Sequence, residues 1–142
     1  MKKEMILFFL IIMNIACSAQ YRVISDKPGC TKEYDSILKH NVYTWVDEMP
    51  QYLNGIKDML KYFTSNYHTP NNSNILQGTV KLEFIVTDEG ILKNINILNK
   101  KPEELTEVDK EAIRVFSSMP KWNPGKCRGI KVPVKMIIPI RF

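Results

Sequence analysis

The fold is decided by the last twelve residues, KVPVKMIIPIRF (131–142), in which the kind of side chain alternates. Every even-numbered position is apolar, whereas the odd-numbered positions carry lysine, proline, isoleucine and arginine. This period of two predicts a β-strand with one buried face. Pro133 and Pro139 have the same parity, so their missing N–H donors lie along one side of the strand. Because proline is tolerated mainly at sheet edges, we expect an edge strand whose odd-numbered residues turn their main-chain groups outward.

A β-hairpin is predicted upstream of this strand. Apolar residues alternate with mostly polar ones over 79–86, which indicates a strand with one buried face. The triplet Asp88-Glu89-Gly90 predicts a turn, since glycine adopts a positive φ at little cost. Residues 91–98 are then expected to return as the antiparallel second strand.

Two amphipathic helices complete the predicted elements. Apolar residues at helical spacing predict one helix over 54–66, with Asn54 as its N-cap. The residues expected to share its buried face are Leu53, Ile56, Met59, Leu60 and Phe63. A second helix is expected to begin at a capping box formed by Thr106 and Asp109 and to end before Pro120. Helices striped on one side and strands with one apolar face predict an α+β fold of two layers.

The N-terminal 41 residues are expected to lie outside the folded domain, which the sequence predicts over 42–142. A basic start followed by a short apolar run makes 1–19 an export signal. Two processing routes are open: cleavage after Ala19, or lipid attachment at Cys17. Residues 20–41 are polar and are predicted to be a tether. The mature chain is thus expected outside the cytoplasm, in the periplasm, touching a membrane only through its signal or a lipid.

The side-chain inventory argues against several classes of function. The chain contains only two histidines and no recognisable catalytic or metal-binding motif, so we expect no enzyme activity, no metal and no cofactor. A formal net charge of +5, scattered along the chain, does not indicate nucleic-acid binding. Cys30 and Cys127 could form a disulfide in an oxidising compartment or remain as two thiols, because sequence does not give their separation.

The predicted edge of the last strand has two interpretations. Between its prolines it offers the main-chain donors and acceptors of Lys135 and Ile137, with Arg141 beyond, and an extended partner could pair there by strand addition. Prolines and lysines at an edge are also how proteins prevent such pairing. The residues alone do not decide between these interpretations.

Ordered motifs over 42–142 resemble the C-terminal domain of TonB-family energy transducers of the Bacteroidetes type. The resemblance implies a three-stranded antiparallel sheet with two helices on one face. The motifs that carry it are VYTWVDEMPQY (42–52), LQGTV (76–80), FIVTDEG (84–90), SMPKWNPG (118–125), and Gly129, VPV (132–134) and PIRF (139–142).

The same resemblance implies a periplasmic module that captures the TonB box of an outer-membrane receptor by strand addition, in TonB-dependent transport. The loop that follows the first helix is expected to contribute. The alternative is a structural or self-associating envelope lipoprotein, which would form a homodimer through the same edge. The residues expected to bind the partner are Lys131, Pro133, Lys135, Ile137, Pro139 and Arg141 in the last strand and Asn66, Tyr67 and His68 in the loop.

Overall fold

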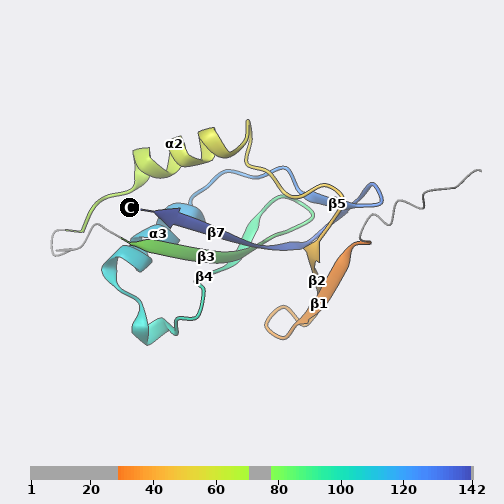
Figure 1. Cartoon of the computed structure of the whole chain (residues 1–142), viewed down its shortest axis with the longest axis horizontal. Coiled ribbons are helices and arrows are strands. Elements are labelled where there is room, and N and C mark those ends of the chain that lie inside the picture. Colours follow the sequence, from red (N-terminus) through yellow and green to blue (C-terminus); the bar gives the residue numbers. More distant parts are fainter. Residues whose placement is uncertain (1–28, 71–77, 142) are drawn as a thin grey trace, which may run out of the picture.

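The computed structural model describes residues 29–70 and 78–141. This part of the chain forms two layers, a β-sheet and a pair of helices (Figure 1). In chain order its elements are β1 (Thr31–Asp35), β2 (His40–Trp45), α2 (Ile56–Asn66), β3 (Thr79–Val86), β4 (Leu92–Ile97), the 3-10 helix η2 (Pro102–Glu104), α3 (Glu107–Ser117), β5 (Gly125–Cys127), β6 (Ile130–Val132) and β7 (Val134–Arg141).

The main sheet has five strands in the order β1-β2-β7-β3-β4. β3 and β7 are antiparallel over their whole lengths, whereas β2 runs parallel to β7. β5 and β6 form a second, two-stranded antiparallel sheet. The α+β class is confirmed, but the expected three-stranded antiparallel sheet is wrong, because β1 and β2 add two strands on the far side of β7.

The predicted hairpin is present as β3 and β4, and its turn explains the need for glycine. Gly90 has φ 80°, and a Cβ built there would lie 2.0 Å from the carbonyl oxygen of Trp122. The two residues are also joined by a 2.9 Å hydrogen bond from the Trp122 N–H to the Gly90 carbonyl. The turn thus brings the segment after α3 against the end of the hairpin, where only glycine fits.

α3 begins at the predicted capping box. The Thr106 hydroxyl accepts from the Asp109 N–H at 3.2 Å, and the Asp109 carboxylate accepts from the Thr106 N–H at 2.9 Å. Asp109 is buried and also binds the Lys100 ammonium at 2.5 Å. Burial alone would raise the pKa of Asp109, but the hydrogen bonds from Lys100 and Thr106 outweigh it and lower the pKa.

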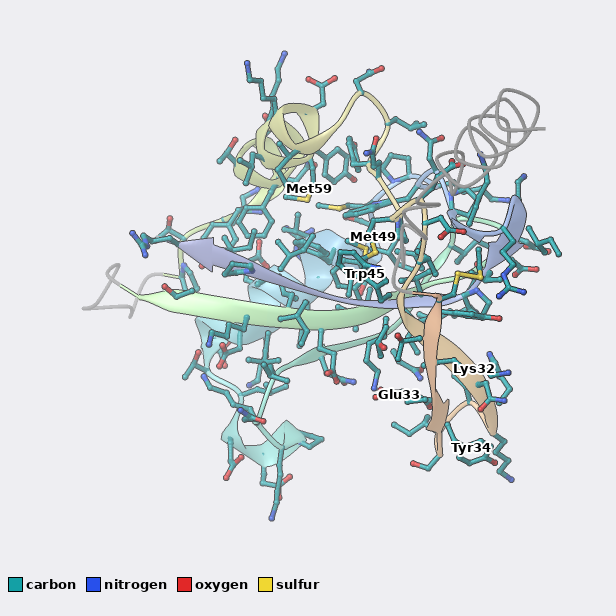
Figure 2. All side chains as sticks on the ribbon, turned by 45° about the vertical axis from the view of Figure 1, so that its right-hand side comes forward. Lys32, Glu33, Tyr34, Trp45, Met49 and Met59 are labelled. Carbon is teal, nitrogen blue, oxygen red and sulfur yellow. A yellow bond between two sulfur atoms is a disulfide. The ribbon has the colours of Figure 1, made fainter. Side chains whose placement is uncertain are left out.

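α2 is also present, but it begins two residues later than predicted. Asn54 and Gly55 both have positive φ, 64° and 89°, so neither is helical, and Gly55 is the N-cap in place of Asn54. Met59 and Phe63 are buried against the sheet, and Figure 2 shows Met59 between α2 and the strands. Ile56 and Leu60, expected on the same buried face, are exposed.

The core between the layers joins both helices to one face of the sheet. It contains the buried even-numbered residues of β3 and Ile140 of β7, together with the aromatic residues of α2, α3 and the segment after α3. Val134 of β7 belongs to a smaller cluster with Val46 and Val132. Ring pairs such as Phe84 with Phe116, at 5.4 Å, and Phe84 with Trp122, at 5.5 Å, occupy its centre. This confirms the apolar face predicted for the two strands.

The N-terminal arm, defined here as β1, β2 and the turn between them (31–45), replaces part of the predicted tether. The sequence predicts a polar tether over 20–41, whereas residues from Thr31 onward form an antiparallel hairpin. Its turn is closed by Asp35, whose Oδ1 accepts from the N–H groups of Ile37 and Leu38 at 3.0 and 2.8 Å. Residues 20–28 of that predicted tether lie outside the described residues.

A disulfide anchors the arm at its start. Cys30 is bonded to Cys127 in β5, with their Cα atoms 6.0 Å apart. Beside this bond, the N–H of Arg128 donates to the Asp47 carboxylate at 2.6 Å. This hydrogen bond ties the chain after β2 to the turn between β5 and β6. The disulfide interpretation is therefore the one that the structure supports.

Candidate partner-binding edge

β7 is an interior strand at its start, which corrects the expected edge position. Tyr43 of β2 pairs with Val134, and its N–H donates to the Pro133 carbonyl at 2.9 Å. In parallel pairing a residue bonds to both neighbours of its partner, so Tyr43 takes up main-chain groups of Pro133 and Lys135. Pro133 permits this neighbour because proline lacks only the donor and keeps its carbonyl. The N-terminal end of β7 is therefore covered.

Beyond Lys135 the same side of β7 is open within the described residues. Tyr43 is the last residue of β2 that pairs with β7, and the chain then leaves the sheet toward α2. In Figure 1, α2 lies on the β7 side of the sheet, and α3 lies behind the sheet near β3. The predicted edge thus exists only over the second part of the strand, which we call the open segment (137–141).

The register shows which main-chain groups point outward from the open segment. The Leu98 N–H donates to the Lys81 carbonyl at 2.9 Å, which directs the main chain of Lys81 toward β4. Its partner on β7 is Pro139, so this pair is not hydrogen-bonded. Antiparallel pairs alternate, and the polar groups of Ile137 and Arg141 therefore also point away from β3. The prediction that the odd-numbered residues of this strand direct their main-chain groups outward is correct over the open segment.

Side chains of β7 alternate between the two faces of the sheet. Ile140 is buried under the helices, whereas Val134 is buried on the same face in a second cluster with Val46 and Val132. Met136 and Ile138 are partly buried on that face. Ile137 projects to the opposite face and is 48% exposed. The open segment therefore has apolar side chains on both faces beside its free main-chain groups.

Lys135, predicted to bind a partner, is instead tied to the arm. Its ammonium lies 2.5 Å from Oε1 of Glu33 in β1. The hydrogen bond with Glu33 raises the pKa of Lys135, with partial burial acting in the opposite direction. Figure 2 shows Glu33 on the side of β1 that faces the sheet, whereas Lys32 and Tyr34 project from the other side. Lys135 thus secures the arm across β7.

Lys131 does not lie on the open segment either. It belongs to β6, where it pairs with Lys126 of β5, and its side chain is exposed. Of the six predicted strand residues, the structure leaves Ile137, Pro139 and Arg141 on the open edge, and assigns the other three to β6 and to the contact with the arm.

The predicted loop residues are held by α3. The carbonyl of Asn66 accepts from Nη2 of Arg114 at 2.6 Å, and the His68 N–H donates to Glu111 at 2.9 Å. Hydrogen bonds from Arg114 lower the pKa of Glu111 to about 2, with the His68 N–H contributing. The ring of Tyr67 stacks on Phe63 in the core, and burial raises its pKa.

These loop residues and the open segment lie at the same end of the molecule. In Figure 1 the chain leaving α2 and the end of β7 are both at the left, near the C-terminal mark. A surface cleft of about 510 Å³ adjoins the loop, lined mostly by charged residues of α3 together with residues 68–70. The sequence predicted this proximity only through the family resemblance.

One group of potential metal ligands occurs in the described residues, and the disulfide accounts for it. Ligand atoms of Cys30, Asp47 and Cys127 lie within 4.8 Å of one another. Both sulfurs are joined to each other, so neither is a thiolate that could bind a metal. The arrangement serves as a covalent anchor for the arm.

The family follows from residues 71–142, which match the model of the Gram-negative bacterial TonB protein C-terminal. The match covers just over half of the chain. The chain belongs to the TonB C-terminal family. It therefore has a TonB-like role in receptor interaction and energy transduction at the cell envelope. No curated protein and no solved structure matches the chain.

The TonB match contains β3 to β7, whereas the arm and α2 precede it. Sequence reasoning missed the arm and its Glu33–Lys135 contact, although the apolar residues Val42 and Val46 near β2 were a usable signal. In the described residues no helix is long and apolar enough to cross a membrane. The predicted signal, with Cys17 and Ala19, lies outside these residues.

Proposed function

We propose that this TonB-family chain captures an extended segment of an outer-membrane receptor, the TonB box, by adding it as a strand to the open segment of β7. The observation that carries the proposal is a row of outward main-chain groups that begins where β2 leaves the sheet. Ile137 and Arg141 each offer a donor and an acceptor, and Pro139 offers an acceptor. Five residues at about 3.3 Å each give a pairing length of roughly 16 Å.

The two outer edges of the sheet are less suited to an incoming strand. β1 carries Lys32, Glu33 and Asp35 among its five residues, and charged side chains discourage edge pairing. β4 contains Asn94 in the left-handed conformation, with φ 49°, and its pairing with β3 is irregular. Such irregularity interrupts the flat row of donors and acceptors that strand addition needs.

The proposal places the mature chain in the periplasm, after removal of the signal or attachment of a lipid at Cys17. There the domain acts as a binding module without bond chemistry, and its partner supplies the specificity of transport. Support comes from the family and from the open segment of β7.

The test compares Ile137→Pro with Ile137→Ala in the chain that begins at Gln20. Envelope proteins of the native cell are captured on each variant and on wild type, and identified by mass spectrometry. Ile137→Pro removes an outward donor, whereas Ile137→Ala keeps it and removes most of the side chain. We expect outer-membrane receptors with wild type and with Ile137→Ala, and their loss with Ile137→Pro.

A receptor found in this way is then tested directly with a synthetic peptide of its N-terminal periplasmic segment. Binding of that peptide at the open segment should broaden or shift the amide signals of residues 137–141 in an NMR titration. If folded Ile137→Pro captures receptors as well as wild type does, strand addition at this edge is wrong. If wild type captures only itself and is a dimer by light scattering, the self-associating alternative replaces the transport role.

A further inference from the structure

The outward flank of α2, formed by Ile56 and Leu60, is an apolar surface that stays largely exposed in the described part of the chain. Both side chains are exposed, Ile56 by 58% and Leu60 by 43%. They are separated by four residues, so they lie on the same side of the helix. Because α2 also buries Met59 and Phe63, it carries more apolar surface than the core covers.

The position of α3 shows which way this flank faces. Tyr62 reaches toward α3, where its hydroxyl donates to the Ser118 carbonyl at 2.7 Å. At 100° per residue, Ile56 and Leu60 lie on the opposite side of Met59 from Tyr62. Since α3 covers β3 and β4, the flank away from α3 is on the side of β7 and its open segment.

The helix-facing side of β7 also has apolar residues that are not fully covered. Met136 and Ile138 pack against the core but are only partly buried, in contrast to Val134 and Ile140 in the same strand. A strand added to the open segment would send every second side chain toward the helix layer, beside these two residues and the flank of α2. Its other side chains would lie on the opposite face of the sheet.

The opposite face has a different chemistry. Around Ile137 it presents Lys81, Glu83 and Arg141, and none of these three side chains is buried. Residues of a partner strand on this face would therefore remain near charged groups and water, whereas those on the helix side would be covered by aliphatic carbon.

We infer that Ile56 and Leu60 select the partner: the captured segment carries aliphatic side chains at alternate positions on its helix side and polar side chains between them. This inference rests on the proposed strand addition at β7. It assigns a selective role to α2, which lies outside the part of the chain that matches the family model.

The experiment uses two synthetic nine-residue peptides of equal composition. In one, valine and threonine alternate; in the other, the valines are grouped at one end. Their affinities for the chain from Gln20 onward are measured by NMR titration. We expect wild type to bind the alternating peptide more tightly. Leu60→Ser should weaken that binding about 5- to 20-fold and remove the preference, because aliphatic area beside the partner is lost.

Lys57→Ser is the matched control, because it shortens an exposed side chain on another side of α2. It should bind both peptides as wild type does. Thermal unfolding shows whether Leu60→Ser has a folding defect. Ile56→Ser repeats the binding test at a more exposed position, so the result does not depend on Leu60→Ser alone. A wild-type preference that persists in both serine variants overturns the selective role of α2. Wild type that binds neither peptide overturns the inference together with the proposed strand addition.

Discussion

The two parts of β7 differ in what lies beside them, although one alternating sequence runs through both. At Val134 the strand has β3 on one side and Tyr43 of β2 on the other. From Ile137 onward it has β3 alone within the described residues. The difference shows that whether a strand is interior or at an edge can change within a few residues. Here the change is made by a distant segment, the N-terminal arm.

The strongest test of this difference releases the arm from its anchor. Cys30→Ser combined with Cys127→Ser removes a bond between residues 97 positions apart. Because such a link restricts the unfolded chain, we expect the free energy of unfolding to fall by about 4 kcal/mol. Urea unfolding measures this, and reduced wild type is the matched control that should unfold like the variant. Equal midpoints for oxidised and reduced wild type would show that the disulfide does not stabilise the arm.

A pair of proline substitutions separates the two sides of β7. Met136→Pro removes a donor that faces β3, and we expect a loss of about 3 kcal/mol or more, because a ladder hydrogen bond is broken and a buried carbonyl is left unpaired. Ile137→Pro removes an outward donor and should cost less than about 1 kcal/mol. Urea unfolding of both variants gives the comparison. Similar losses for the two would mean that the main-chain directions assigned to β7 are incorrect.

The loop beside the open end should depend on acid pH. The pKa of Glu111 is lowered to about 2, so its stabilising effect is present above the pKa of about 4.5 expected in the unfolded chain. That effect is lost as the pH falls from 5 toward 2. Since Arg114 is half exposed and solvent screens the pair, we expect a contribution of only about 1 kcal/mol at neutral pH.

Glu111→Gln isolates this contribution. Wild type and variant are unfolded in urea at several values between pH 2 and pH 7, and their difference should shrink as the pH falls. Other carboxylates titrate in both proteins and cancel in the comparison. A difference that stays constant over this range would rule out the ionised Glu111 as the source.

The smallest effect is expected at the contact between the arm and β7. Glu33 and Lys135 are 49% and 23% exposed, so solvent screens their attraction. A double-mutant cycle with Glu33→Gln and Lys135→Met should give a coupling of about 0.5–1 kcal/mol. Thermal or urea unfolding of the four proteins measures it. A coupling near zero would leave the arm held by its disulfide and main-chain pairing alone.

Local features explain why α3 and the β3–β4 hairpin were predictable from the sequence. The capping box of Thr106 and Asp109, and the turn at Gly90, are formed by residues close together in the chain. α2 was predicted with a wider buried face than it has, because helical spacing shows which residues are apolar but not which of them the sheet covers.

The arm could not be predicted in the same way. β1 is exposed over nearly its whole length, so its residues show no apolar alternation, and its pairing depends on β2 and on a cysteine far along the chain. The prediction that β7 is an edge strand was correct for its second part and wrong for its start. Pro133 and Pro139 indicate where donors are missing, but pairing with Tyr43 uses the carbonyl that proline retains.

The disulfide has a mechanical consequence. A force applied to the chain before Cys30 is transmitted through the disulfide to Cys127, and from there along β6 to β7. The helices and the β3–β4 hairpin are bypassed by this covalent path and carry no tension along it. When the force runs along β7, a partner strand held beside it would be loaded in shear, so that its main-chain bonds would resist together instead of opening one by one.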